Sequence, residues 1–329
     1  MADITTKYCG LDLKNPFIVG SSGLTSGVDS INRLAKSGAA AVVLKSVFEE
    51  EILLEYKQTF KNQLGSQEAN LEFFDYYDYQ LKGEMLENTT ELINRVKESN
   101  DIPVIASINC RSSAEWFSYA KNLEKAGADA IELNIHRVVD SVDESAAVIT
   151  EKYLNIVQKV KKHVTIPVAV KMSPFFADTA HMASQFEKAG ADALVMFNRY
   201  YSPDIDLENN KLISAPVYSN PGDYTLPLRW ISLLSGKLKT DIAASTGIHS
   251  PESMIKMLVA GASAVQIVSA LYKNGPDYLL DFSHYLEEWM DKKGFDTLKD
   301  IREYGRTMIP SNSEMFERVQ FMKYFGKRC

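Results

Sequence analysis

Short apolar runs follow helix-like segments that end on glycine, and this unit recurs along the chain. Four copies are evident: AKSGAAAVVLKS (35–46), EKAGADAIELN (124–134), EKAGADALVMFN (187–198) and LVAGASAVQIVS (258–269). The glycine of each copy suits the left-handed conformation that ends a helix. The run after it is apolar at most positions, which is typical of parallel strands covered by helices. The pattern therefore predicts four helix-to-strand junctions.

The spacing of these glycines indicates further strands between them. Successive glycines are 89, 63 and 71 residues apart, or about three, two and two βα units of some 30 residues. Four more strands fit these gaps, in NPFIVGSSG (15–23), DIPVIASIN (101–109), TIPVAVKMS (165–173) and TDIAASTG (240–247). Eight strands alternating with helices, with no GxGxxG after the first, favour a closed TIM (β/α)8 barrel over an open doubly wound sheet.

The barrel is expected to form a single domain over residues 1–329. Two insertions, residues 47–85 and 199–229, fall in strand-to-helix loops, on the face where such barrels carry their sites. Helical runs in residues 296–329 predict a C-terminal extension that packs outside the barrel or on a second subunit.

The predicted strand ends are unusually polar. They comprise Ser21, Ser22, Gly23, Lys45, Ser46, Asn109, Asn134, Lys171, Asn198, Ser245, Thr246, Gly247, Val268 and Ser269. Any single Ser or Asn here is equally well explained as the cap of the next helix. A lysine that closes a buried strand instead needs an anion. With no Asp or Glu at the other strand ends, we expect that anion to be a ligand, bound by Lys45 and Lys171.

Two loops predict where a phosphate would bind. STGIHSPES and IVSALYKNG place small residues and backbone N–H groups after the seventh and eighth strands, which is the usual phosphate corner of a barrel. The five histidines share no metal-ligand spacing, so a metal site is not expected.

The composition of the chain limits the kinds of binding partner and the cellular location that we expect. Lys plus Arg number 36 and Asp plus Glu 43, giving a net charge of −7, which argues against charge-driven binding to nucleic acid or anionic membranes. Three scattered cysteines favour a reducing, cytoplasmic location. No run of about 18 apolar residues predicts a membrane span.

These motifs together resemble the dihydroorotate dehydrogenases, FMN-dependent TIM barrels. The resemblance covers nearly the whole chain, through NPFIVGSSG, NLEFFDYYDYQL, SINC, IELN, VAVKMSP, FNR, ASTGI and VQIVSALYKNGP. It implies FMN over the barrel mouth, with its phosphate near Gly247, Ile248, Val268 and Ser269. It also implies ring contacts at Ser21, Ser22 and Gly23, and a flavin-binding set of Lys45, Ser46, Asn134 and Lys171.

The same resemblance implies that Asn62, Asn134 and Asn198 bind a pyrimidine substrate. The chain departs from the family in the loop after the fourth strand. Where the family has ELNLSCPN, with a cysteine or serine base, this chain reads ELNIHRVVDSVDES, and Arg137 stands in place of the cysteine. Ser141, His136 or Asp140 could act as the base instead. Arg137 and Arg199 are either ligands of an anionic substrate or solvated loop residues.

The resulting hypothesis is transfer of hydride from dihydroorotate or a related anionic pyrimidine to FMN, in the soluble type of enzyme. Electrons would then pass to fumarate, or to NAD through a partner subunit. The resemblance also implies a homodimer. Two alternatives stay open: a flavin- or anion-binding protein without this activity, and a Schiff-base aldolase that uses Lys171.

Overall fold

A computed structural model describes residues 2–48, 86–109, 115–135 and 142–309, together with residues 316, 317, 320, 322 and 323. Five residues named above, Asn62, His136, Arg137, Asp140 and Ser141, lie outside the described residues. Their predicted roles stay predictions.

The predicted barrel is confirmed. Eight parallel strands pair in a closed ring, in the order β3 (Phe17–Val19), β4 (Ala41–Val43), β6 (Val104–Asn109), β7 (Ala130–Asn134), β8 (Val168–Lys171), β9 (Ala193–Met196), β12 (Asp241–Ser245) and β13 (Ala264–Ile267). β13 pairs with β3 and so closes the ring. A short strand, β5 (Val47–Phe48), adds to β6. Each barrel strand lies in one of the eight predicted segments.

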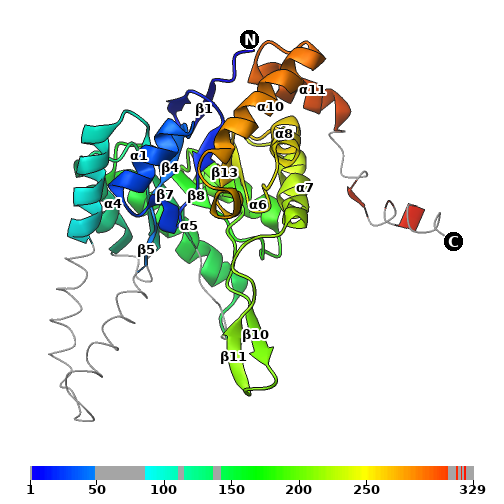
Figure 1. The fold of residues 1–329 in the computed structure, drawn as a ribbon. Coiled ribbons are helices and arrows are strands. Elements are labelled where there is room, and N and C mark those ends of the chain that lie inside the picture. Colours follow the sequence, from blue (N-terminus) through cyan, green and yellow to red (C-terminus); the bar gives the residue numbers. More distant parts are fainter. Residues whose placement is uncertain are drawn as a thin grey trace, which may run out of the picture.

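Helices surround the ring (Figure 1). They are α1 (Val28–Lys36), residues 86–99, α4 (Glu115–Lys125), α5 (Ala146–His163), α6 (Thr179–Lys188), α7 (Thr225–Leu234), α8 (Pro251–Ala260), α9 (Ser269–Asn274), α10 (Tyr278–Lys293) and α11 (Leu298–Met308). The four junction glycines, Gly38, Gly127, Gly190 and Gly261, have φ of +105°, +95°, +102° and +110°. The left-handed helix ends read from the sequence are therefore confirmed.

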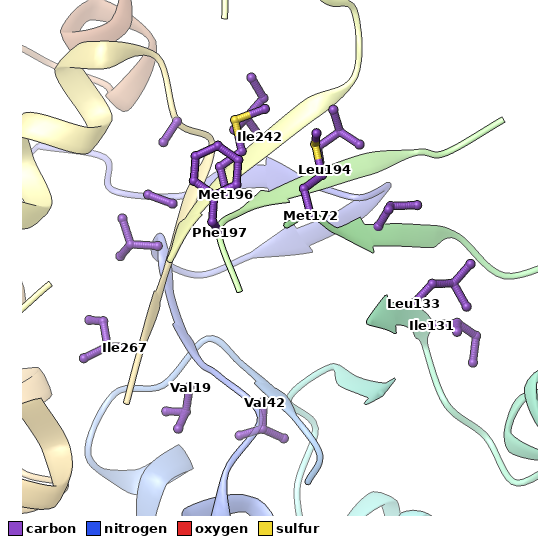
Figure 2. Packing of buried hydrophobic residues seen from close by; sticks show 14 of the residues in the cluster. Val19, Val42, Ile131, Leu133, Met172, Leu194, Met196, Phe197, Ile242 and Ile267 are labelled. Atoms are coloured by element: carbon purple, nitrogen blue, oxygen red, sulfur yellow. The ribbon is translucent and has the colours of Figure 1, made fainter. Parts of the chain in front are cut away.

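The strands bury two separate cores, because successive side chains point to opposite faces. Large apolar side chains such as Ile131, Leu133 and Leu194 pack outward against the helices (Figure 2). The inward-facing cluster is made largely of alanines, including Ala130, Ala169, Ala193, Ala243 and Ala264. Small side chains low in the interior leave room for long polar ones above them.

The two ends of the barrel differ. At the amino end, the antiparallel pair β1 (Thr6–Tyr8) and β2 (Leu11–Leu13) contributes the buried Tyr8 and Cys9 to the interior cluster. The insertion after β9 forms an antiparallel hairpin, β10 (Pro203–Asp206) and β11 (Lys211–Ser214), which projects from the opposite end (Figure 1). It leads through η2 (Pro221–Tyr224) into α7.

Within the predicted extension of residues 296–329, α11 packs against α8, and the extension as a whole stays a prediction. A carbon added at Gly305 would lie 1.7 Å from the carbonyl oxygen of Val259, so the two helices approach very closely there. None of the helices in the described part of the chain has the length and apolar character needed to cross a membrane.

Candidate functional site

A cavity of about 550 Å³ opens at the carboxyl ends of the barrel strands. Most predicted site residues in the described chain line it: Ser21, Ser22, Gly23, Lys171, Asn198, Arg199, Ser245, Thr246, Gly247, Ile248, Val268 and Ser269. The hairpin insertion forms part of its wall, from Ser214 to Ser219. The structure thus brings together residues that are up to about 250 positions apart in the sequence.

The lysine at its floor, Lys171, has partners that the sequence reading missed. Its Nζ lies 3.3 Å from Oε1 of Glu132 and donates to Oε1 of Gln266 at 3.0 Å. Gln266 in turn donates from Nε2 to Oε2 of Glu132 at 2.5 Å. Lys171 and Glu132 are 7% and 1% exposed. The expectation that the counter-anion of Lys171 must come from outside the protein is therefore wrong.

Strand parity explains how Glu132 arrives there. Glu132 is two residues before Asn134 in β7, so both side chains point into the barrel, whereas Ile131 and Leu133 point to the helices (Figure 2). Gln266 occupies the equivalent inward position in β13. A single polar residue inside each apolar run, AIEL and AVQI, was the available signal.

Three serines connect neighbouring strand ends. Ser21 Oγ lies 3.0 Å from Ser46 Oγ and accepts from Ser46 N at 2.9 Å, and Ser46 Oγ lies 2.6 Å from Ser107 Oγ. Ser107 is a further residue that the sequence reading missed. Ser22 has the capping role that was the alternative reading, because its Oγ accepts from Leu24 N at the start of a 3-10 turn.

The predicted phosphate corner has a constrained backbone. Thr246 and Gly247 both have left-handed φ, +79° and +81°, and Thr246 Oγ1 donates to the carbonyl of Phe197. Beside the corner, His249 Nε2 lies 2.8 Å from Ser219 Oγ, and Ser219 N donates to Ser269 Oγ. Burial and the nearby Lys273 lower the pKa of His249, so this imidazole is neutral near pH 7.

Asn198 lines the cavity and contacts a second asparagine, Asn134, which does not line it. Asn198 Nδ2 donates to Asn134 Oδ1 at 2.9 Å, which leaves an amide carbonyl on Asn198 and an amide N–H₂ group on Asn134 for other partners. Tyr200 also lines the cavity, and burial raises its pKa to about 12, so it is a neutral phenol there.

Arg199 lines the cavity, but its guanidinium is engaged within the chain. It pairs with Asp223 at 3.0 Å and donates to the carbonyls of Pro216, Val217 and Tyr218. In this arrangement it fixes the wall of the insertion. These contacts use four of the five N–H donors of the guanidinium, so one donor, on Nη1, is left for a substrate anion, the partner of its predicted role.

Lys45, Ser46, Asn109 and Asn134 do not appear among the described residues that line the cavity. Ser46 and Asn134 still reach it indirectly, through Ser21 and Asn198. Asn109 is buried at the end of β6, and the Lys45 side chain is exposed beyond the end of β4.

Chemically, the cavity offers a buried ammonium, amide groups of both polarities and a rim of small residues. A ligand with a flat polar ring and an anionic tail would match these groups. The arrangement combines an ammonium at the floor, paired with the carboxylate of Glu132 behind it, with hydrogen-bonding groups at the opening.

Comparisons with known proteins show what the whole chain is similar to. A family model described as dihydroorotate dehydrogenase matches residues 3–290. The chain is 29% identical over 312 residues to "Dihydroorotate dehydrogenase B (NAD(+)), catalytic subunit" of Thermoplasma volcanium, covering 92% of this chain and 98% of that protein. It is 25% identical over 324 residues to "NAD-dependent dihydropyrimidine dehydrogenase subunit PreA" of Escherichia coli K12, covering 91% of this chain and 76% of that protein.

Proposed function

Because this chain belongs to the dihydroorotate dehydrogenase family, whose members are flavin-dependent oxidoreductases of CH–CH donors, we propose that it oxidises a reduced pyrimidine with bound FMN. The observation that carries the proposal is the presence of Lys171 and Asn198 in the lining of one cavity, with Asn134 bonded to Asn198. Dihydroorotate and uncharged dihydropyrimidines are both candidate substrates, since relatives named for each match the chain.

The described residues fit FMN. The cavity volume of about 550 Å³ lies within the usual range of roughly 300–1,000 Å³ for cofactor sites. Gly23 keeps a side chain off the wall beside Tyr272, whose hydroxyl an added carbon would meet at 2.8 Å, and the absence of a side chain at Gly247 lets its backbone lie against the Asp223–Tyr224 segment. We assign the phosphate to Gly247, Ile248, Val268 and Ser269, and the ring system to Ser21, Ser22, Gly23 and Lys171.

When bound, FMN supplies the acceptor for a hydride from the pyrimidine ring. Lys171 then has a defined electrostatic role. An ammonium at the floor of a water-poor site stabilises negative charge that develops on the ring above it, by a few kcal/mol. Lys171 is buried and held by two partners, Gln266 and Glu132, so its position does not have to reorganise when that charge appears.

The asparagine pair orients the substrate. The carbonyl of Asn198, which lines the cavity, can accept from a ring N–H, and the bond from Asn198 to Asn134 fixes the orientation of this amide. An acceptor in this place suits an N–H of a pyrimidine edge. The group that removes the substrate proton is proposed to be Ser141 or His136, in the loop after β7.

The aldolase alternative is disfavoured by the surroundings of Lys171. A Schiff base forms from a neutral amine, and such lysines are desolvated or placed near other cations. Lys171 instead lies against a carboxylate and donates to an amide oxygen, which are the contacts of an ammonium.

We also propose that a separate protein receives the electrons, because relatives are named as a catalytic subunit and as subunit PreA. A homodimer of this chain, the expected assembly, is likewise a proposal. Size measurement of the purified chain, alone and with its co-purifying partners, tests both.

The decisive experiment begins with the absorbance spectrum of the purified protein and mass spectrometry of any group released by heating. Release of FMN is expected. Anaerobic mixing with dihydroorotate, dihydrouracil and dihydrothymine should then bleach the flavin band with one of them. An Asn198→Ala variant should keep the flavin but lose rapid bleaching. Holoprotein that none of these compounds bleaches at any pH would overturn the proposed reaction and favour a flavin-binding role.

A further inference from the structure

Three side chains from three strands form a closed ring inside the barrel, which we call the Glu132–Lys171–Gln266 triad. Lys171 donates to Gln266, Gln266 donates to Glu132, and Glu132 is ion-paired with Lys171. β8 and β13 are separated by β9 and β12 in the barrel, so the contact between Lys171 and Gln266 crosses its interior. All three side chains are buried.

Within the triad, only Lys171 and Gln266 line the cavity, and Glu132 lies behind them. A ligand in the cavity therefore meets the ammonium and the amide, while the carboxylate acts on it through them. Glu132 Oε1 accepts no hydrogen bond from the described residues, so its contact with Lys171 is purely ionic. The carboxylate is thus held against the ammonium by charge.

We propose that Glu132 is a positioning residue that neutralises the floor of the cavity, and thereby keeps the bound flavin harder to reduce than Lys171 alone would make it. This inference rests on the proposed function. A lone ammonium would strongly favour the negative charge of a reduced flavin. The carboxylate behind it leaves a triad with no net charge, whose field falls off faster with distance.

Glu132 also fixes the orientation of both neighbours. Because its Oε2 accepts from Gln266 Nε2, the carbonyl end of that amide must face Lys171. Lys171 has three N–H donors. One is bound by Gln266 and a second faces Glu132, which leaves the third for the cavity. Loss of the carboxylate would free the Gln266 amide to turn and the ammonium to move.

The test is the midpoint potential of the bound flavin in a Glu132→Gln variant, measured by equilibrium titration against a reference dye. We expect the reduction equilibrium to shift at least tenfold toward the reduced form, which is about 30 mV for a two-electron couple. Glu132→Asp keeps the charge and should stay near the wild-type potential. Glu124→Gln removes a carboxylate bound to Lys121 and Thr165, outside the cavity, and controls for overall charge.

A second pair of variants is needed in case Glu132→Gln fails to fold, because it leaves a buried cation without its counter-charge. Lys171→Met and Lys171→Met/Glu132→Gln differ only in the carboxylate: the double variant removes both buried charges, whereas Lys171→Met alone leaves Glu132 without its cation, so flavin binding is checked in each. The double variant should have the higher potential, again by at least tenfold in the equilibrium. Equal potentials within both pairs, in protein that binds FMN, would overturn the inference. Wild-type protein that binds no flavin would instead overturn the proposed function.

Discussion

The tightest packing at the cavity predicts a large effect of a single methyl group at Gly247. An alanine there would place its Cβ 2.1 Å from the nitrogen of Tyr224 and 2.5 Å from the carbonyl carbon of Asp223. Both are backbone atoms of the segment that leads into α7, so no side-chain rotation can relieve the contact. The residue would also keep a φ of +81°, in the left-handed region.

The two costs can be estimated separately. A non-glycine residue in the left-handed region costs about 1–2 kcal/mol. Overpacking by one carbon group costs about 1–3 kcal/mol. Gly247→Ala should therefore lower the free energy of unfolding by about 2–5 kcal/mol. Because relief requires η2 and the Ser245–Ile248 segment to move apart, FMN affinity should fall at least tenfold, which is about 1.4 kcal/mol of binding free energy.

Urea unfolding of the flavin-free protein, followed by circular dichroism, measures the first effect, and quenching of flavin fluorescence measures the second. Gly236→Ala is the matched control, because a carbon added there meets nothing within 4 Å. Its stability should lie within about 0.5 kcal/mol of the wild type. If Gly247→Ala matches Gly236→Ala in both stability and FMN affinity, the account of this corner is refuted.

Two further changes test the outer shell and the pH dependence. Gly305→Ala would improve helix propensity by up to about 1 kcal/mol in an open helix, but its Cβ would meet Val259 O at 1.7 Å. We therefore expect net destabilisation in urea, and a gain in stability would refute the close α8–α11 contact. His249 has a pKa lowered below 6.5, so the unfolded chain gains a proton there that the folded chain does not. The free energy of unfolding should therefore fall as pH falls below about 6.5, and it should fall less in His249→Gln. Urea titrations of both proteins at pH 7.5 and 5.5 measure this difference. An equal fall in both would contradict the lowered pKa of His249.

The barrel could be predicted from the sequence because its signal is repeated. A glycine with φ near +100° follows α1, α4, α6 and α8, and each is followed within a few residues by a buried strand. One such junction is a weak indication, whereas four at multiples of one βα unit fix both the strand count and the crossovers. The hairpin β10–β11 could not be predicted with them, because its residues are exposed and lack that apolar pattern.

The site was harder to predict than the fold. Polar strand ends identified the cavity-lining serines and Lys171, since the carboxyl ends of parallel strands share one rim. The same reasoning predicts Lys45 at the site, on a weaker basis, because β4 ends at Val43 and side-chain alternation no longer fixes a residue two positions beyond a strand. Glu132 was missed because of its position in the strand. It lies inside a strand, whereas only the last residues of each predicted strand are candidates.

The composition of the barrel interior explains why such a polar triad can exist at all. Alanines occupy the inward positions one step below Glu132, Lys171 and Gln266 in the same strands, at 130, 169 and 264. Larger residues there would fill the axis, and three long side chains could not meet across it. The three side chains must also keep their hydrogen bonds and ion pair to one another, because removing one partner of a buried ion pair typically costs about 3–5 kcal/mol. The stability of the barrel and the charge of its cavity floor therefore depend on the same three residues, so this site cannot change its electrostatics one residue at a time without a cost in folding.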